Sequence, residues 1–102
     1  MTFKEFKDSL IAGTPPPELS QLGKALWHDA KGDWTASHTL AQDVNTPDGS
    51  WVHAYLHRKE GDLANALYWY SLANRKMPGI SLEEEWEGIV RSLLAHRQSS
   101  LS

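Results

Sequence analysis

Apolar residues recur at intervals of three and four along most of this 102-residue chain, and no segment alternates apolar and polar residues over the length of a strand. That spacing is typical of amphipathic helices, because an α-helix completes one turn in 3.6 residues. The pattern therefore predicts an all-α fold. It is clearest near the C-terminal end, in the run Leu82, Trp86, Ile89, Val90, Leu93 and Leu94.

Helix caps and helix breakers divide the chain into about six helices. Asp, Ser and Thr cap helix N-termini, and Gly and Pro interrupt helices. Three glutamates, Glu83 to Glu85, follow a cap at Ser81 and suit the positive end of the helix dipole. The expected helices are a short one from Thr2, one from about Pro17 to Gly32, one from Asp33 to about Asp43, one from Asp48 or Ser50 to Glu60, one from Asp62 to about Lys76, and one at about 81–97.

The middle of the chain nearly repeats itself at a spacing of 29 residues. A fixed period of this size is typical of stacked helix hairpins, because one hairpin cannot bury its apolar face alone. We therefore expect a single domain, 1–102, with hairpin units at about 17–44 and 49–76. The two copies are Ala25-x-x-His28-x-x-x-Gly32-Asp33 and Ala54-x-x-His57-x-x-x-Gly61-Asp62.

The second copy resembles the second half of a tetratricopeptide repeat, and the resemblance covers roughly residues 19–78. It implies two tetratricopeptide-like antiparallel hairpins, flanked by a short N-terminal helix and a C-terminal capping helix. The chain departs from the family in its leading helix, where His53, Ala54 and His57 replace the usual Leu, Gly and Tyr. The matching residues are Gly61-Asp62-Leu63-x-x-Ala66-x-x-x-Tyr70-x-x-Ala73-x-x-x-x-Pro78.

The segment from Trp51 to Asp62, with Asn65, Trp69 and Tyr70 after it, is also similar to a group of small bacterial proteins. This resemblance implies a stand-alone cytoplasmic protein and carries over no catalytic residue. Composition agrees with that expectation. A net charge of −3 provides no basic stripe for nucleic acid, and no apolar run approaches the length of a membrane span. The chain has no cysteine, which excludes disulfides and thiolate chemistry.

One candidate binding surface is an aromatic face of the fourth expected helix. Trp51 and Tyr55 share this face, with Arg58 one turn further on. The family resemblance implies that such a face lines a concave peptide-binding surface, and an aromatic pair beside a guanidinium suits a peptide or its carboxylate. The competing interpretation is that the first or last helix covers this face as core. We expect a non-enzymatic interaction module that binds a protein or peptide.

Tyr68, Trp69 and Tyr70 are consecutive and point in three directions on a helix, so they cannot all enter one core. Tyr70 is the expected buried member. Of the other two, we take Trp69 as a fourth binding residue, on a surface that serves a partner or self-association. The alternative is that the last helix, with Trp86, covers them.

The alternative function is a metal or small-ligand site. His53 and His57 are four residues apart, so their rings share one helix face, as metal ligands do. His38 or His28 supplies a third nitrogen, and a transition metal such as zinc is then the expected cofactor. The competing interpretation is that these rings pack between the helices of a hairpin; in that case no cofactor is expected. No nucleophile elbow or phosphate-binding glycine run accompanies them, so no catalytic residue is assigned.

Overall fold

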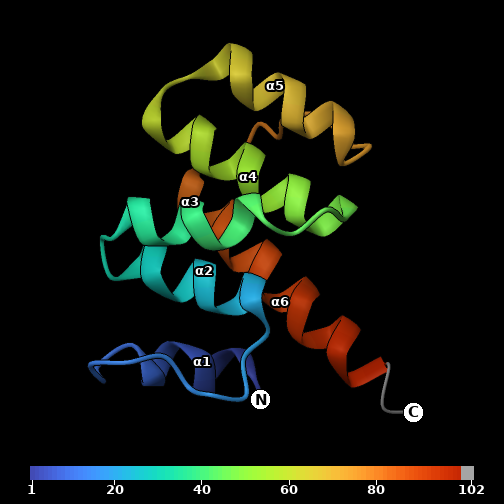
Figure 1. Cartoon of the computed structure of the whole chain (residues 1–102). Helices are drawn as coiled ribbons and strands as arrows, with labels where there is room; N and C mark the ends of the chain where they lie inside the picture. Colours follow the sequence, from blue (N-terminus) through green and yellow to red (C-terminus); the bar gives the residue numbers. More distant parts are fainter. Residues whose placement is uncertain (100–102) are drawn as a thin grey trace.

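A computed structural model describes residues 1–99, and residues 96–99 by their backbone only. The described chain is all-α, with six helices and no strand, which confirms the predicted fold class (Figure 1). None of these helices is both long enough and apolar enough to cross a membrane. The helices are α1 (Phe3–Ser9), α2 (Gln21–Ala30), α3 (Trp34–Gln42), α4 (Pro47–Glu60), α5 (Leu63–Leu72) and α6 (Leu82–Ser99).

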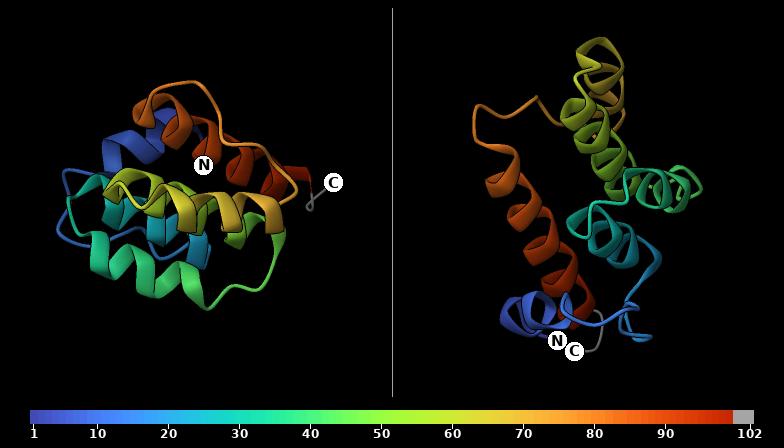
Figure 2. Two further views of the ribbon diagram at one scale, coloured as in Figure 1. Left: turned by 90° about the horizontal axis from the view of Figure 1, so that it is seen from above. Right: turned by 90° about the vertical axis from the view of Figure 1, so that its left-hand side faces the viewer.

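Four of the helices pack as two antiparallel hairpins, α2 with α3 and α4 with α5. The hairpins meet where α3 packs on α4, and α5 forms one end of the stack (Figure 1). The long helix α6 runs along one side and contacts α2 and α4, while α1 packs against α6 at the other end of the stack (Figure 2). Within the described residues, the backbone of α5 lies close to that of α4 alone among the helices, and its side chain Tyr70 reaches α6.

The two Gly-Asp pairs are helix breakers and caps, as predicted. Gly32 and Gly61 have φ angles of 85° and 89°, in the left-handed region that glycine adopts without a steric penalty. Asp33 and Asp62 then cap the next helix, because each carboxylate accepts a hydrogen bond from the backbone N–H three residues later. The repeat therefore marks the turn inside each hairpin.

Two helices begin at other residues than predicted, because a neighbouring hydroxyl is the better cap. Helix α2 begins at Gln21 instead of Pro17, since the Ser20 hydroxyl accepts from the Gly23 N–H at 3.1 Å. Helix α4 begins at Pro47 instead of Asp48 or Ser50. There Thr46 caps the helix and Pro47 occupies the first turn, where its missing N–H costs nothing.

Helix α5 ends at Leu72, short of the expected Lys76. The cause is Asn74, which adopts a left-handed φ of 59°. This turns the chain so that the Arg75 N–H donates to the Tyr70 carbonyl at 2.9 Å. Asparagine tolerates that conformation better than most residues, so it ends a helix much as glycine does.

The first turn of α6 contains a buried carboxylate. Glu85 is 2% exposed and binds three side chains from α4 and α5. Its oxygens accept hydrogen bonds from the Trp51 indole N–H at 3.2 Å, from the Arg58 guanidinium at 2.8 Å and from the Tyr70 hydroxyl at 2.6 Å. The helix-dipole interpretation of Glu83 to Glu85 is therefore incomplete, because Glu85 also attaches α6 to the stack.

Replacing Glu85 with Ala should destabilise the protein by about 3–5 kcal/mol, because it leaves the Arg58 guanidinium and two buried donors without their acceptor. The matched control is Glu83→Ala, in the same turn but exposed, with an expected cost below about 1 kcal/mol. Urea unfolding followed by circular dichroism measures both. Equal stabilities for the two variants would contradict the role given to Glu85.

Candidate functional site

The predicted aromatic binding face is covered by α6. Trp51 and Tyr55 are buried, and Arg58 is bound to Glu85 and to the Ile80 carbonyl. The guanidinium of Arg75 also lies over the Trp51 ring, 3.4 Å from its centre. The structure thus corrects the expectation of an open groove at Trp51, Tyr55 and Arg58. The core interpretation applies, because α6 lies across this side of α4.

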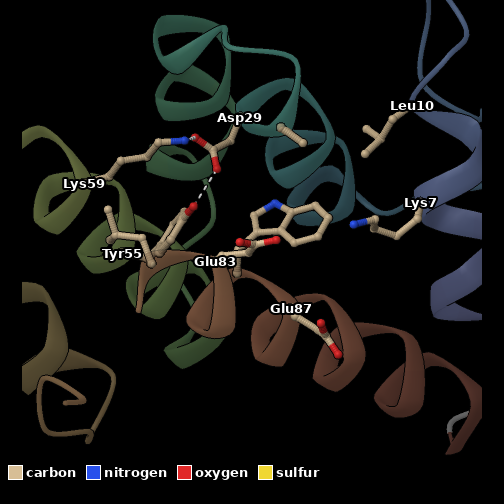
Figure 3. Close-up of a pocket in the computed structure, with 10 residues that line it drawn as sticks. Lys7, Leu10, Asp29, Tyr55, Lys59, Glu83 and Glu87 are labelled. Carbon is tan, nitrogen blue, oxygen red and sulfur yellow. Dashed lines mark hydrogen bonds and ion pairs between the residues drawn. The ribbon is translucent and has the colours of Figure 1, made fainter. Parts of the chain in front are cut away.

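Tyr55 instead belongs to a polar group that lines a hollow of about 340 Å³ between α1, α2, α4 and α6 (Figure 3). Its hydroxyl donates to one oxygen of the buried Asp29, and Lys59 binds the other oxygen, both at 2.8 Å. Burial, followed by the nearby Asp29 charge, raises the pKa of Tyr55. Since each Asp29 oxygen has a protein partner on α4, this group joins α2 to α4.

Three histidines gather on the other side of α4. His53 and His57 come from α4 and His38 from the neighbouring α3. One ring nitrogen of each residue lies within 4.8 Å of those of the other two. The Nε2 atoms of His38 and His53 are 2.9 Å apart, so one ring donates a hydrogen bond to the other. We call His38, His53 and His57 the histidine cluster.

His28, the other candidate for a third nitrogen, is not part of the cluster. It lies on α2, and its ring contacts Trp27 with the ring centres 5.3 Å apart. The equivalent positions of the two repeats therefore have different surroundings. His57 faces α3, which bears His38, whereas His28 occupies the leading helix of the other hairpin.

Two tryptophans enclose the histidine cluster. Trp34, at the start of α3, stacks on His38 with ring centres 4.8 Å apart, and its indole N–H donates to the Leu56 carbonyl at 2.9 Å. Trp69 of α5 stacks on His53 at 3.9 Å. Trp69 is thus a wall of this site and is separate from Trp51. The sequence analysis missed Trp34, whose one signal was its place after the Gly-Asp cap.

An acidic residue orients the third ring. The Nδ1 atom of His57 lies 2.6 Å from a Glu60 carboxylate oxygen, so Nδ1–H donates to Glu60. In the neutral form of the ring, the Nε2 atom of His57 is then the nitrogen that carries the lone pair. A carboxylate on the far nitrogen of a metal-binding histidine is a common arrangement, because it fixes the tautomer and the orientation of the ring.

The environment favours neutral rings at His53 and His38. Burial lowers the pKa of His53 to about 4, with smaller contributions from the charges of His38 and His57. Burial and the neighbouring His57 also lower the pKa of His38. Neutral imidazole is the form that binds a metal, so protons compete little for His53 at neutral pH.

The nitrogen positions are close to those that a metal requires. Two nitrogens bound to one tetrahedral zinc at 2.0–2.1 Å lie about 3.3 Å apart. The two Nε2 atoms of His38 and His53, now 2.9 Å apart, would separate by a few tenths of an ångström, and nitrogens up to 4.8 Å apart would move closer together.

His57, Glu60 and Asp62 form a second group of potential ligands, but there Asp62 caps α5 and Glu60 holds His57.

Metal-free protein should lose stability as the pH falls from about 6.5 towards 4. In that interval His53 takes up a proton in the unfolded chain, where its pKa is ordinary, but not in the folded protein. Unfolding therefore becomes easier, by about 1–2 kcal/mol between pH 7 and pH 5. Urea unfolding in the presence of a chelator measures this, and His53→Gln should show a shallower pH dependence than wild type. Parallel curves for the two proteins would contradict the buried neutral state.

No protein-family model, curated protein or solved structure matches this chain. The relationship to the tetratricopeptide family therefore stays a prediction that rests on the signature residues of the second hairpin.

Proposed function

We propose that this protein binds a transition metal, with zinc as the first candidate, through His38, His53 and His57. The observation that carries the proposal is the convergence of three ring nitrogens, from two packed helices, within 4.8 Å of one another. Imidazole nitrogen suits zinc, copper, nickel and iron, whereas calcium and magnesium take oxygen ligands. Zinc is favoured because three protein ligands in a tetrahedral arrangement are one of its common sites.

The surroundings of the histidine cluster support a rigid site. Trp34 and Trp69 pack on two of the rings, and Glu60 holds the third by a hydrogen bond. Ligands that are fixed before binding lose less conformational entropy when a metal enters. The two helix hairpins would then act as the scaffold that sets α3 against α4.

Three histidine ligands leave a fourth metal position for water or a small ligand. His38 is half-buried, whereas His53 and His57 are buried, so solvent reaches the site on the His38 side. The chain supplies no thiolate, and a site with only nitrogen ligands and one open position differs from a closed structural zinc site. We assign metal binding and no reaction to this site.

Protein prepared without a histidine tag and stripped with a chelator should bind one equivalent of cobalt(II). The expected signal is the visible absorption of tetrahedral cobalt, which added zinc should remove. Zinc should also raise the melting temperature, because a ligand that binds only the folded state stabilises it, by about 2.7 kcal/mol at a free concentration of 100 times Kd.

Matched variants locate the site. His38→Ala, His53→Ala and His57→Ala should each abolish stoichiometric cobalt binding, whereas His28→Ala should keep it, because His28 lies outside the cluster. Glu60→Gln should weaken binding by about 10–100-fold, since it removes the carboxylate that orients His57. Wild-type protein that binds no cobalt or zinc, or a His53→Ala variant that binds as well as wild type, would refute the proposal.

The sequence also predicted that a protein or peptide binds at a groove formed by Trp51 and Tyr55. That groove is not open, because α6 covers both residues. A protein partner therefore requires a different surface.

A further inference from the structure

The outer face of α5 is apolar and uncovered by any described residue of the chain. This helix packs on α4 with one side only and stands at the end of the stack (Figure 1). Four large side chains on its other side are between 50% and 59% exposed. Exposed apolar patches of several hundred Å² on a soluble protein usually mark interaction surfaces. The four residues are Leu63, Leu67, Tyr68 and Leu72.

Helix α5 contains no charged residue between Leu63 and Leu72. The end of a stacked helical array is normally polar, because an apolar end leaves surface in water that the next unit would cover. The uncharged face offers no pattern that selects a charged partner. The same face of a second copy is a compatible partner, however, because pairing two uncharged faces brings no like charges together.

The exposed residues of α5 are arranged symmetrically about the middle of the helix, which lies between Leu67 and Tyr68. Ala64 and Ser71, both exposed, are seven residues apart and share one line along the helix. Leu67 and Tyr68 flank that line on its two sides. Further out, Leu63 and Leu72 lie at equal distances from the centre, near the two ends of the helix.

We infer that this face pairs with the same face of a second copy, with the two α5 helices antiparallel about a two-fold axis. Such an axis through the middle of α5 sets Ala64 against Ser71 of the second copy. It also brings the two Leu67 side chains together on one flank of the contact and the two Tyr68 side chains together on the other. Leu63 and Leu72 then close the contact at both ends. A two-fold contact uses the same patch on both copies, which a symmetrical face provides. Small residues on the central line let the two helix axes approach to about 8 Å.

The exposed area agrees with a reversible dimer. About half of each of the four large side chains amounts to at most roughly 900 Å² over two copies, which is below the about 1,200 Å² of stable specific interfaces and within the range of weak, transient ones. Leu67 and Ser71 also line a hollow that continues along Asn74, Arg75 and Lys76. In the antiparallel pair, Leu67 of the second copy lies next to Leu67 beside this hollow, which adds to the contact.

This inference does not rest on the proposed metal function. The histidine cluster lies between α3 and α4, and Trp69 of α5, which is half-buried against α4, stacks on it. If the protein binds no metal, the dimer proposal is unaffected. If the protein does not dimerise, the metal proposal is likewise unaffected.

Sedimentation velocity over a wide concentration range tests the pairing. Wild-type protein should show a reversible monomer–dimer equilibrium, and Leu67→Glu should raise its dissociation constant at least about tenfold. The matched control is Ile11→Glu. Ile11 is 94% exposed but lies outside α5, so this variant should associate like wild type. Wild-type protein that stays monomeric at every concentration, or equal effects of the two substitutions, would overturn the inference.

Single cysteines test the antiparallel arrangement, because the natural chain has none. A mixture of the Ala64→Cys and Ser71→Cys variants should form a disulfide-linked heterodimer under mild oxidation, while each variant alone should link far less. Efficient linking of Ala64→Cys with itself would indicate parallel helices and overturn the antiparallel pairing. Absence of any link in the mixture would overturn the pairing itself.

Discussion

The attachment of α6 to the stack through Glu85 decides which surfaces of this protein are available. A buried carboxylate is stable only when donors surround it, and Trp51, Arg58 and Tyr70 supply them. Helix α6 consequently lies on the side of α4 where a peptide groove was expected. The histidine side of α4 packs against α3 and α5 instead. The ring of His53 therefore lies between helices, in contact with His38 of α3 and Trp69 of α5. The packing of α3 and α5 on α4 thus forms the histidine cluster, while the Glu85 contacts decide which other side of α4 is covered.

The sequence predicted the helices well because helix ends are determined locally. Gly61 and Asp62 act within one turn, so their roles can be predicted from the neighbouring residues alone. The errors were also local, and the error at the start of α4 arose where two caps competed. Thr46 and Asp48 both suit a helix N-terminus, and the Pro47 ring, favoured in the first turn, decides between them. Asn74 was missed as the end of α5 because a left-handed asparagine is less common than a glycine.

The candidate site was only half predictable. The spacing of His53 and His57 placed two rings on one face, since four residues complete about one helical turn. Whether His38 or His28 supplies the third ring depends on which helix packs beside α4. The spacing of apolar residues within one helix does not show which other helix packs on it. The same limit applies to Trp51, whose burial depends on Glu85, 34 residues away in the chain. Contacts within one helix were visible in the sequence, whereas contacts between helices were not.

The central claim is that three imidazoles hold one metal between α3 and α4. X-ray absorption at the zinc edge, on protein loaded with one equivalent of zinc, tests it most directly. We expect about three nitrogen neighbours at 2.0–2.1 Å with the outer-shell scattering of imidazole rings, and one further light atom. A first shell of oxygen atoms without imidazole scattering would contradict it, because the metal would then lie outside the histidine cluster.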